Sequence, residues 1–403
     1  MIQRGKLALL TFVHFLTDFY SSLLTPVLPA LIVKLNLSLT YAGILAGLPS
    51  VTSSLVQPLM GVLGDRMEKR YFIVIGPLFA AVFMSAIGAS PTFSLLVILI
   101  ILGGFGTASF HPQSVSMAGE VSGSKRGLGV SLFIGGGTAG LALSPLLVTK
   151  FVESYSLESM VWLAVPGVIA VLLLARFIPI QNTGRRMVRL SELKESFRPN
   201  LRPMILLTVV VIIRTLSGVG FGVFLALLMT ERGFTLQEGG FVLMIYQVGA
   251  VIGGFAGGWA SDRVGRARVI WSTILLSTPF LLATLYTSGP LMYVLLFFGG
   301  FLNMASNSVS VAFAQEMVPD NAATASSFPM GFSWGVAGAM LMVFGNIADR
   351  IGLVSAMEIL AIIPITGGLL GLALPGHPGR GGEPPTLSST PMPLPELKQQ
   401  PAG

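Results

Sequence analysis

Long apolar runs recur along almost the whole of the first 375 residues, and they decide what this chain can fold into. A helix needs about 20 apolar residues to cross a hydrocarbon core of about 30 Å. Charged residues make up only 10% of the chain, whereas a soluble domain has about 25%. The runs lack the alternation of barrel strands, so they must be helices, which satisfy their own backbone in lipid. We therefore predict an all-α membrane protein with twelve transmembrane helices, at roughly residues 7–33, 40–63, 71–89, 92–118, 127–149, 158–178, 203–229, 236–260, 268–287, 291–316, 322–347 and 353–375.

Lysine and arginine are distributed unevenly over the loops between these spans. If both termini are placed in the cytoplasm, 19 of the 24 basic residues lie on the inner side, and four (Lys34, Lys150, Arg232 and Arg350) lie on the outer side. The remaining one, Arg214, lies inside a span. An excess of basic residues on the cytoplasmic side is typical of membrane proteins. It predicts a multi-pass protein of the bacterial inner membrane with both termini in the cytoplasm, and it explains the net charge of +7 without a nucleic-acid partner.

The apolar pattern stops in the middle of the chain and again near its end. Between Ile180 and Arg202 it gives way to a basic segment, and after Gly376 it gives way to proline and glycine. We expect an N-terminal six-helix bundle at residues 1–179, a cytoplasmic linker at 180–202, a C-terminal six-helix bundle at 203–375 and a disordered cytoplasmic tail at 376–403. The alternative for the tail is a partner-binding segment.

The two halves of the chain share a loop motif, found after the second span and again after the eighth. The first loop motif comprises Gly61, Asp65, Arg66 and Arg70, and the second comprises Gly258, Asp262, Arg263 and Arg266. The two aspartates are 262 − 65 = 197 positions apart. A further match between Gly103 and Gly299 has an offset of 299 − 103 = 196. Two matches at almost the same offset indicate an internal duplication, which is how many secondary transporters are built.

With these two loop motifs on a twelve-span chain, the sequence resembles the major facilitator superfamily over residues 1–375. Two further stretches resemble the fosmidomycin-resistance family of drug exporters: His14-Phe-Leu-Thr-Asp18 in the first span and Phe110-His111-Pro112-Gln113-Ser114 in the fourth. That family usually has an acidic residue where this chain has Gln113. The resemblance implies two pseudo-symmetric six-helix bundles and the export of small molecules driven by protons.

In the superfamily that this chain resembles, the loop motif is a gate that holds the cytoplasmic side shut in one conformation. A carboxylate such as Asp65 can face the N-terminus of a neighbouring helix, whose partial positive charge favours anions. The start of the eleventh span, near Asn321 to Thr324, is the receptor we expect. The alternative is an ordinary basic loop with one capping aspartate.

Asp18 lies near the middle of the first span, where an ionisable group costs several kcal/mol and is usually retained for function. His14 lies one helical turn away on the same face. We predict that Asp18 takes up and releases a proton in each transport cycle, with His14 and His111 as further proton-coupling residues. Histidine suits this role because it titrates near neutral pH. The alternatives are a permanent ion pair between Asp18 and Arg214, and hydrogen-bonded packing for His111.

Arg214 is the only full charge in the middle of the seventh span, near the position that the duplication relates to Asp18. Its guanidinium group suits carboxylate, phosphate or phosphonate groups, so it either binds an anionic substrate or neutralises Asp18. We also take Gln113, Asn303 and Asn307 as candidate substrate-binding residues, although amides at such positions equally suit helix association.

Nothing in the sequence indicates an enzyme. Residues 135–140 fit a dinucleotide-binding pattern, but they lie inside the fifth span, and no Walker-type lysine loop or hydrolytic triad occurs. We expect no cofactor and no metal. The sequence predicts a monomeric secondary active transporter in the lipid bilayer that exports a small organic compound or drug in exchange for protons, by rocker-switch alternating access. The alternative is a proton symporter that takes up a small organic anion.

Overall fold

The computed structural model describes residues 3–66, 69–123, 126–177 and 197–376, and within these ranges the regular structure is entirely helical. Twelve candidate membrane spans lie in these ranges, as predicted. The expected linker lies mostly, and the expected tail almost wholly, outside the described residues, so the domain boundaries stay predictions.

The N-terminal half contains six of the spans, and the first of them is made of two helices. Its elements are α1 (Arg4–Ser21), α2 (Leu24–Leu35), α3 (Leu39–Arg66), α4 (Lys69–Ala86), the 3-10 turn η1 (Ile87–Ala89), α5 (Phe93–Val121), α6 (Arg126–Ser154), the 3-10 helix η3 (Glu158–Leu163) and α7 (Ala164–Phe177).

The C-terminal half contains the other six spans, and a π-helix interrupts the eleventh. Its elements are η4 (Arg198–Asn200), α9 (Leu201–Glu231), α10 (Leu236–Val264), α11 (Arg266–Thr284), α12 (Gly289–Met317), η5 (Pro319–Asn321), α13 (Ala322–Ser327), the π-helix η6 (Phe328–Phe332), α14 (Ser333–Ile351), α15 (Leu353–Ile362) and α16 (Pro364–Gly371).

Local sequence signals fix several helix ends. Thr235 begins α10 with a capping box, because its hydroxyl accepts from the Glu238 amide at 3.2 Å while the Glu238 carboxylate accepts from the Thr235 amide at 2.8 Å. Gly265 (φ 96°) separates α10 from α11, and Gly352 (φ 89°) separates α14 from α15. Both adopt a left-handed conformation that favours glycine.

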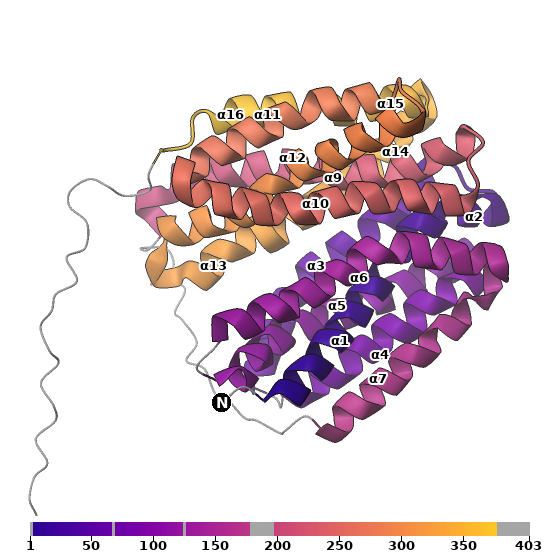
Figure 1. The fold of residues 1–403 in the computed structure, drawn as a ribbon, viewed down its shortest axis with the longest axis horizontal. Helices are drawn as coiled ribbons and strands as arrows, with labels where there is room; N and C mark the ends of the chain where they lie inside the picture. The colour runs from indigo at the N-terminus through magenta and orange to yellow at the C-terminus, as the bar shows by residue number, and fades with distance from the viewer. Residues whose placement is uncertain (1–2, 67–68, 124–125, 178–196, 377–403) are drawn as a thin grey trace, which may run out of the picture.

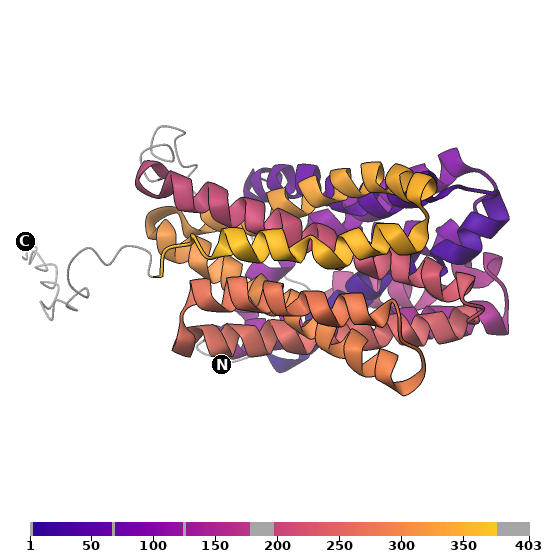
Figure 2. The ribbon, with the colours of Figure 1, turned by 90° about the horizontal axis from the view of Figure 1, so that it is seen from above.

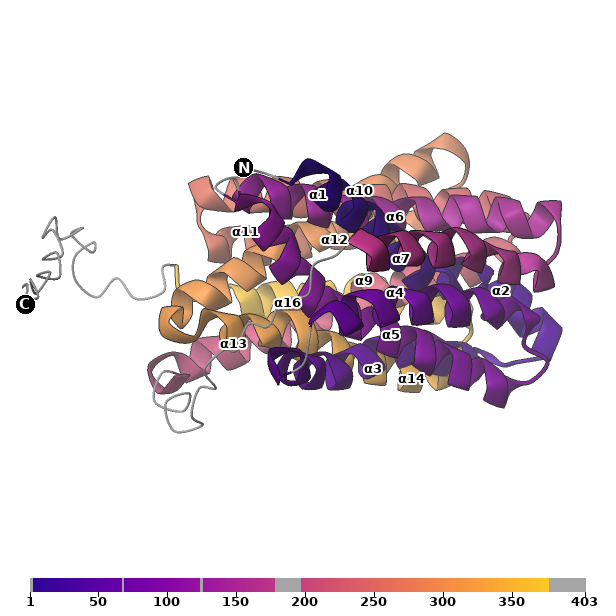
Figure 3. The same cartoon turned by 90° about the horizontal axis from the view of Figure 1, so that it is seen from below.

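The two halves form two bundles that lie side by side (Figure 1), with their helices running along the long axis of the molecule (Figures 2 and 3). We call the end that holds the N-terminus the N-terminus end and the opposite end, where α2 lies, the far end. Two helix pairs make the main contacts between the bundles: α3 with α14, and α6 with α10. Adding about 197 to the residue numbers of α3 gives those of α10, and adding it to those of α6 gives the segment from α13 to α14. The duplication therefore relates the two helix pairs of the interface to each other.

Glycines bring α3 and α14 together closely. A Cβ atom added to Gly43 would lie 2.6 Å from the carbonyl oxygen of Leu341, and one added to Gly338 would lie 2.7 Å from the Ser50 Cβ. Small residues let helix backbones approach in this way within a membrane. The contact between the halves therefore depends on these positions having no side chain.

Two carboxylates join the halves at the far end, and we call these contacts the far-end latches. Asp349, near the end of α14, accepts hydrogen bonds at 2.8 Å from the backbone amides of both Leu39 and Thr40, at the start of α3. Glu153, near the end of α6, accepts one at 2.7 Å from the amide of Gln237, at the start of α10. A helix N-terminus offers free N–H groups that favour an anion. The receptor positions 40 and 237 are 237 − 40 = 197 residues apart, so the duplication relates the two latches.

The first span bends where α1 ends and α2 begins, at Ser22 and Leu23. The segment α1 packs against α6, α4, α5 and α7 of its own half, whereas α2 also packs against α9 and α10 of the other half. The far part of this span therefore touches both bundles.

Candidate functional site

Asp18 lies at the centre of a cluster with two histidines in the N-terminal bundle, which we call the His–Asp–His cluster. One carboxylate oxygen of Asp18 lies 3.3 Å from Nε2 of His14, one turn earlier on α1. The other oxygen lies 3.0 Å from Nε2 of His111 on α5. Asp18 is 7% exposed and His14 is 5% exposed. The structure thus brings together the three residues that the sequence predicted to couple protons.

Both histidines are held by backbone carbonyl groups, and this determines which ring nitrogen carries a proton. Nδ1 of His14 lies 2.8 Å from the carbonyl oxygen of Phe133, and Nδ1 of His111 lies 2.8 Å from that of Thr107. A carbonyl oxygen only accepts, so each Nδ1 must donate. In a neutral imidazole the other nitrogen, Nε2, is then an acceptor. Each Nε2 faces a carboxylate oxygen of Asp18, so each contact becomes a hydrogen bond only when a further proton binds.

Glycine on α6 makes room for this cluster. A Cβ atom added to Gly137 would lie 2.5 Å from Nε2 of His14, in the position where it faces Asp18. The ring of His14 also stacks on Phe133, at 4.1 Å between centroids. In the glycine-rich part of the fifth span, Gly136, Gly137 and Gly140 therefore serve helix packing against α1.

The three side chains of the cluster also have the spacing of a metal site. One ligand atom from each of His14, Asp18 and His111 lies within 4.8 Å of the others. Neutral imidazole nitrogens and a carboxylate suit several divalent transition metals. We expected no metal from the sequence, and the spacing of this group arises only because the fold brings His111 on α5 to His14 and Asp18 on α1.

Arg214 belongs to a separate polar group in the C-terminal bundle. It is fully buried on α9, where its guanidinium donates at 3.0 Å to the side chains of both Asn307 and Thr215. Its Nε has no partner among the described residues. The ion pairs of the described residues do not include one between Asp18 and Arg214, so the alternative of a permanent pair finds no support.

The neutral candidates divide between the two bundles. Asn303 lies one turn before Asn307 on α12, fully buried, and neither atom of its amide group has a partner within the described part of the chain. Gln113 instead donates to the carbonyl oxygen of Met60 at 3.2 Å, which ties α5 to α3. Gln113 is thus part of a contact between helices, while Arg214, Asn303 and Asn307 gather in the other half.

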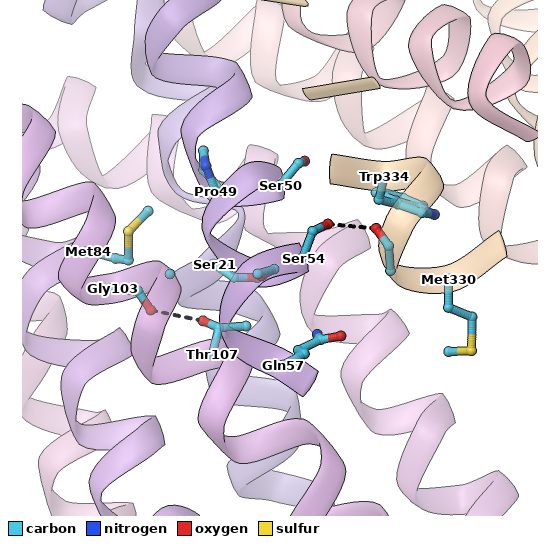
Figure 4. Close-up of a pocket in the computed structure, with 13 residues that line it drawn as sticks. Ser21, Pro49, Ser50, Ser54, Gln57, Met84, Gly103, Thr107, Met330 and Trp334 are labelled. Atoms are coloured by element: carbon cyan, nitrogen blue, oxygen red, sulfur yellow. Dashed lines mark hydrogen bonds between the residues drawn. The ribbon is translucent and has the colours of Figure 1, made fainter. Parts of the chain in front are cut away.

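A cavity of about 240 Å³ lies between the halves, and we call it the hydroxyl pocket (Figure 4). On one side α3 contributes Ser50, Ser53, Ser54 and Gln57, and on the other Trp334 lies at the start of α14. The Ser54 hydroxyl donates across the interface to the carbonyl oxygen of Gly331, at 2.6 Å.

Sequence reasoning missed the hydroxyl pocket, and the predicted substrate-binding residues do not line it. One signal was available: positions 50, 53, 54 and 57 have the spacing i, i+3, i+4, i+7, which places them on one face of a helix. The pocket also borders the His–Asp–His cluster. Ser21 lines it three residues after Asp18, and Thr107 lines it four residues before His111.

Comparison with known proteins identifies the family. A family model described as Major Facilitator Superfamily matches residues 10–328 and 205–400. This chain belongs to that superfamily. The fosmidomycin resistance protein of Escherichia coli (strain K12) is 27% identical to this chain over 379 residues, which are 93% of each protein. YfnC of Bacillus subtilis (strain 168), an uncharacterized MFS-type transporter, is 25% identical to it over 371 residues, which are 90% of each protein. An inward-facing, occupied bacterial homolog of the human lysosomal transporter Spinster has the same fold, with a TM-score of 0.76 at 17% identity over 92% of this chain and 96% of that one.

As a member of the major facilitator superfamily, the chain is a multi-pass membrane protein and a secondary transporter of small molecules rather than an enzyme. The resemblance predicted from the loop motifs is confirmed.

The second loop motif of this superfamily member forms contacts inside its own half. Arg266 pairs with Asp262 at 2.5 Å and with Glu316 at 2.9 Å, which joins α10, α11 and α12. The guanidinium of Arg263 lies 3.7 Å from the centroid of the Trp259 ring. The side chains of the first loop motif (Gly61, Asp65, Arg66 and Arg70) lie outside the described ones, so the gate at this end stays a prediction.

Proposed function

We propose that this protein exports a small organic compound in exchange for protons, by rocker-switch alternating access between its two bundles. The observation that carries the proposal is the His–Asp–His cluster. Its two contacts between Nε2 and carboxylate oxygen are unfavourable without added protons and favourable with them, which is what a proton-binding site requires. The cluster lies beside a cavity between the halves, so proton binding and substrate binding can influence each other.

The far-end latches support alternating access. They close one end of the interface by contacts between the halves, which must break for that end to open. We infer that the far end faces the periplasm and that both termini lie in the cytoplasm of a bacterial inner membrane, since the basic residues gather at the N-terminus end. Relatives named for fosmidomycin and multidrug resistance make drugs a suitable first class of compound to test.

The replacement Asp18→Asn tests the proposal. The transported compound is first found with a susceptibility panel, which includes fosmidomycin, on a strain that overexpresses the protein. In everted vesicles with an acid interior, the variant should lose pH-driven accumulation by about tenfold or more, because an amide cannot take up the proton. Counterflow exchange of the same compound should continue. Glu231→Gln, which removes an exposed carboxylate at the far end of α9, is the matched control. Unchanged pH-driven accumulation in Asp18→Asn would contradict the proposal.

A second candidate function, uptake of a small organic anion by proton symport, is favoured by one observation: the buried charge of Arg214 has no carboxylate partner among the described residues. The same vesicles separate the two functions. An exporter that exchanges its substrate for protons accumulates it when the vesicle interior is acid, whereas a symporter loses it under that gradient.

A further inference from the structure

We propose that the hydroxyl pocket binds the transported compound, and that this compound is uncharged where it binds, carries several hydrogen-bonding groups and has a flat apolar part. The inference rests on the proposed transport function and names the substrate class and the residues that recognise it. It places recognition between the halves rather than at Arg214.

The lining of the pocket defines the chemistry of the ligand. Hydroxyl groups and one amide, from Ser50, Ser53, Ser54 and Gln57, face the cavity along one helix. Among the described residues that line it, none has an ionisable side chain. A ligand with a full charge would lose its hydration in this pocket without gaining a counter-charge, which is unfavourable. Neutral donors and acceptors on the ligand are matched by the hydroxyls instead.

The opposite wall contains two large apolar side chains. Trp334 presents an indole ring from the start of α14, and Met330 contributes a thioether (Figure 4). Indole rings favour stacking with other flat rings, and methionine adapts to varied shapes. Together these side chains suit an aromatic or similarly flat portion of the ligand.

A local distortion of the helix shapes this wall. The π-helix η6 directly precedes α14, and such turns occur frequently at functional sites. Within η6, a Cβ atom added to Gly331 would meet nothing within 4 Å, although Gly331 lines the cavity. A side chain at residue 331 therefore has open space around it at the edge of the pocket, and we expect a large one to extend into the pocket.

The position of the pocket links binding to movement. Ser54 and Gly331, which are hydrogen-bonded to each other, belong to different halves. A ligand that contacts both α3 and α14 binds best when the halves are at one particular separation, so its affinity differs between conformations. A difference of this kind is needed for a ligand to shift a conformational equilibrium.

Binding to the purified full chain tests the inference without a proton gradient. Replacing Trp162, Trp259 and Trp271 with phenylalanine leaves Trp334 as the only tryptophan of the four. Its fluorescence is then titrated with chloramphenicol, an uncharged aromatic compound with hydroxyl and amide groups, and with salicylate and phenyltrimethylammonium as charged aromatic compounds. We expect saturable quenching by chloramphenicol and affinities at least about tenfold weaker for both ions.

Two glycine substitutions show where the compound binds. Gly331→Leu should weaken chloramphenicol binding by about tenfold or more, whereas Gly135→Leu should change it by less than about twofold. Gly135 is the matched control, because a Cβ atom there also meets nothing within 4 Å and the residue does not line the pocket. If Gly331→Leu does not give a monodisperse protein, Ser53→Ala combined with Gln57→Ala takes its place, with Ser272→Ala as control.

The inference is overturned by tighter binding of either ion, by equal effects of the two glycine substitutions, or by the absence of saturable quenching with all three compounds. These results are independent of the proposed function. If the chain binds chloramphenicol as described but shows no pH-driven accumulation, proton exchange is refuted and the assignment of the pocket stands. If it shows pH-driven accumulation but does not bind as described, the assignment of the pocket is refuted and proton exchange stands.

Discussion

The two histidines beside Asp18 approach its carboxylate from different helices, His14 from α1 and His111 from α5. His14 lies four residues before Asp18, so helix geometry alone predicts that the two side chains share a face. His111 is 93 residues away and its role came from the family resemblance, since no local rule brings α5 against α1. The serines at 50, 53 and 54 were missed because hydroxyl groups in membrane helices often bond only to their own backbone, so their spacing does not by itself distinguish a cavity.

Gly137 offers a test of the His–Asp–His cluster that leaves every ionisable residue in place. Gly137→Ala should lower pH-driven transport by about tenfold or more, because the added methyl group would collide with the ring of His14 where it faces Asp18. Gly135→Ala, two residues away with open space around it, should have little effect. The rates are compared in everted vesicles containing equal amounts of folded protein, and equal rates for the two variants would argue against the cluster.

At the scale of helices, the periodic and apolar patterns predict the spans well, because a helix in lipid satisfies its backbone within one segment. Contacts between helices are harder to foresee. A carboxylate facing a helix N-terminus was expected at the first loop motif, and this stays a prediction because the side chains of that motif lie outside the described ones. The described contacts of this kind between the halves are the far-end latches. Asp349 and Glu153 look like ordinary polar residues near span ends, and only the tertiary structure brings the starts of α3 and α10 to them.

The latch at Asp349 predicts a change in which end of the protein opens. Hydrogen bonds to a charged group contribute about 1.5–3 kcal/mol, so Asp349→Asn should favour opening of the far end by about tenfold or more. The chain contains no cysteine, so Ser53→Cys can serve as the only thiol. We expect faster reaction of this thiol with an impermeant maleimide added outside whole cells.

The matched control for this experiment is Glu358→Gln. Glu358 accepts a hydrogen bond from the hydroxyl of Tyr286 within the C-terminal bundle and so makes no latch between the halves. A labelling rate that rises equally in both variants, or in neither, would show that Asp349 does not hold the far end closed.

For the whole molecule, the duplication predicts a transporter whose halves move as units, and the paired interfaces agree with it. A cross-link at the far end should then stop transport in a reversible way. Thr40 and Asn346 belong to different halves, and their side chains lie 3.4 Å apart. Replacing both with cysteine and adding a short bifunctional thiol reagent should reduce transport by about tenfold or more, and reduction should restore it. Full activity of the cross-linked protein would exclude rocking at this interface, and Thr40→Cys alone controls for modification.

The bend in the first span has a mechanical consequence for the proton site. The helix α1 packs within the N-terminal bundle, whereas α2 also packs against the C-terminal bundle. A rotation of one bundle relative to the other must therefore bend the first span at Ser22. That hinge is a single helical turn from Asp18, so the bundles flex the first span directly beside the helix segment that carries the His–Asp–His cluster. The rotation that opens and closes the passage is therefore absorbed one turn away from the residues that we expect to hold the proton.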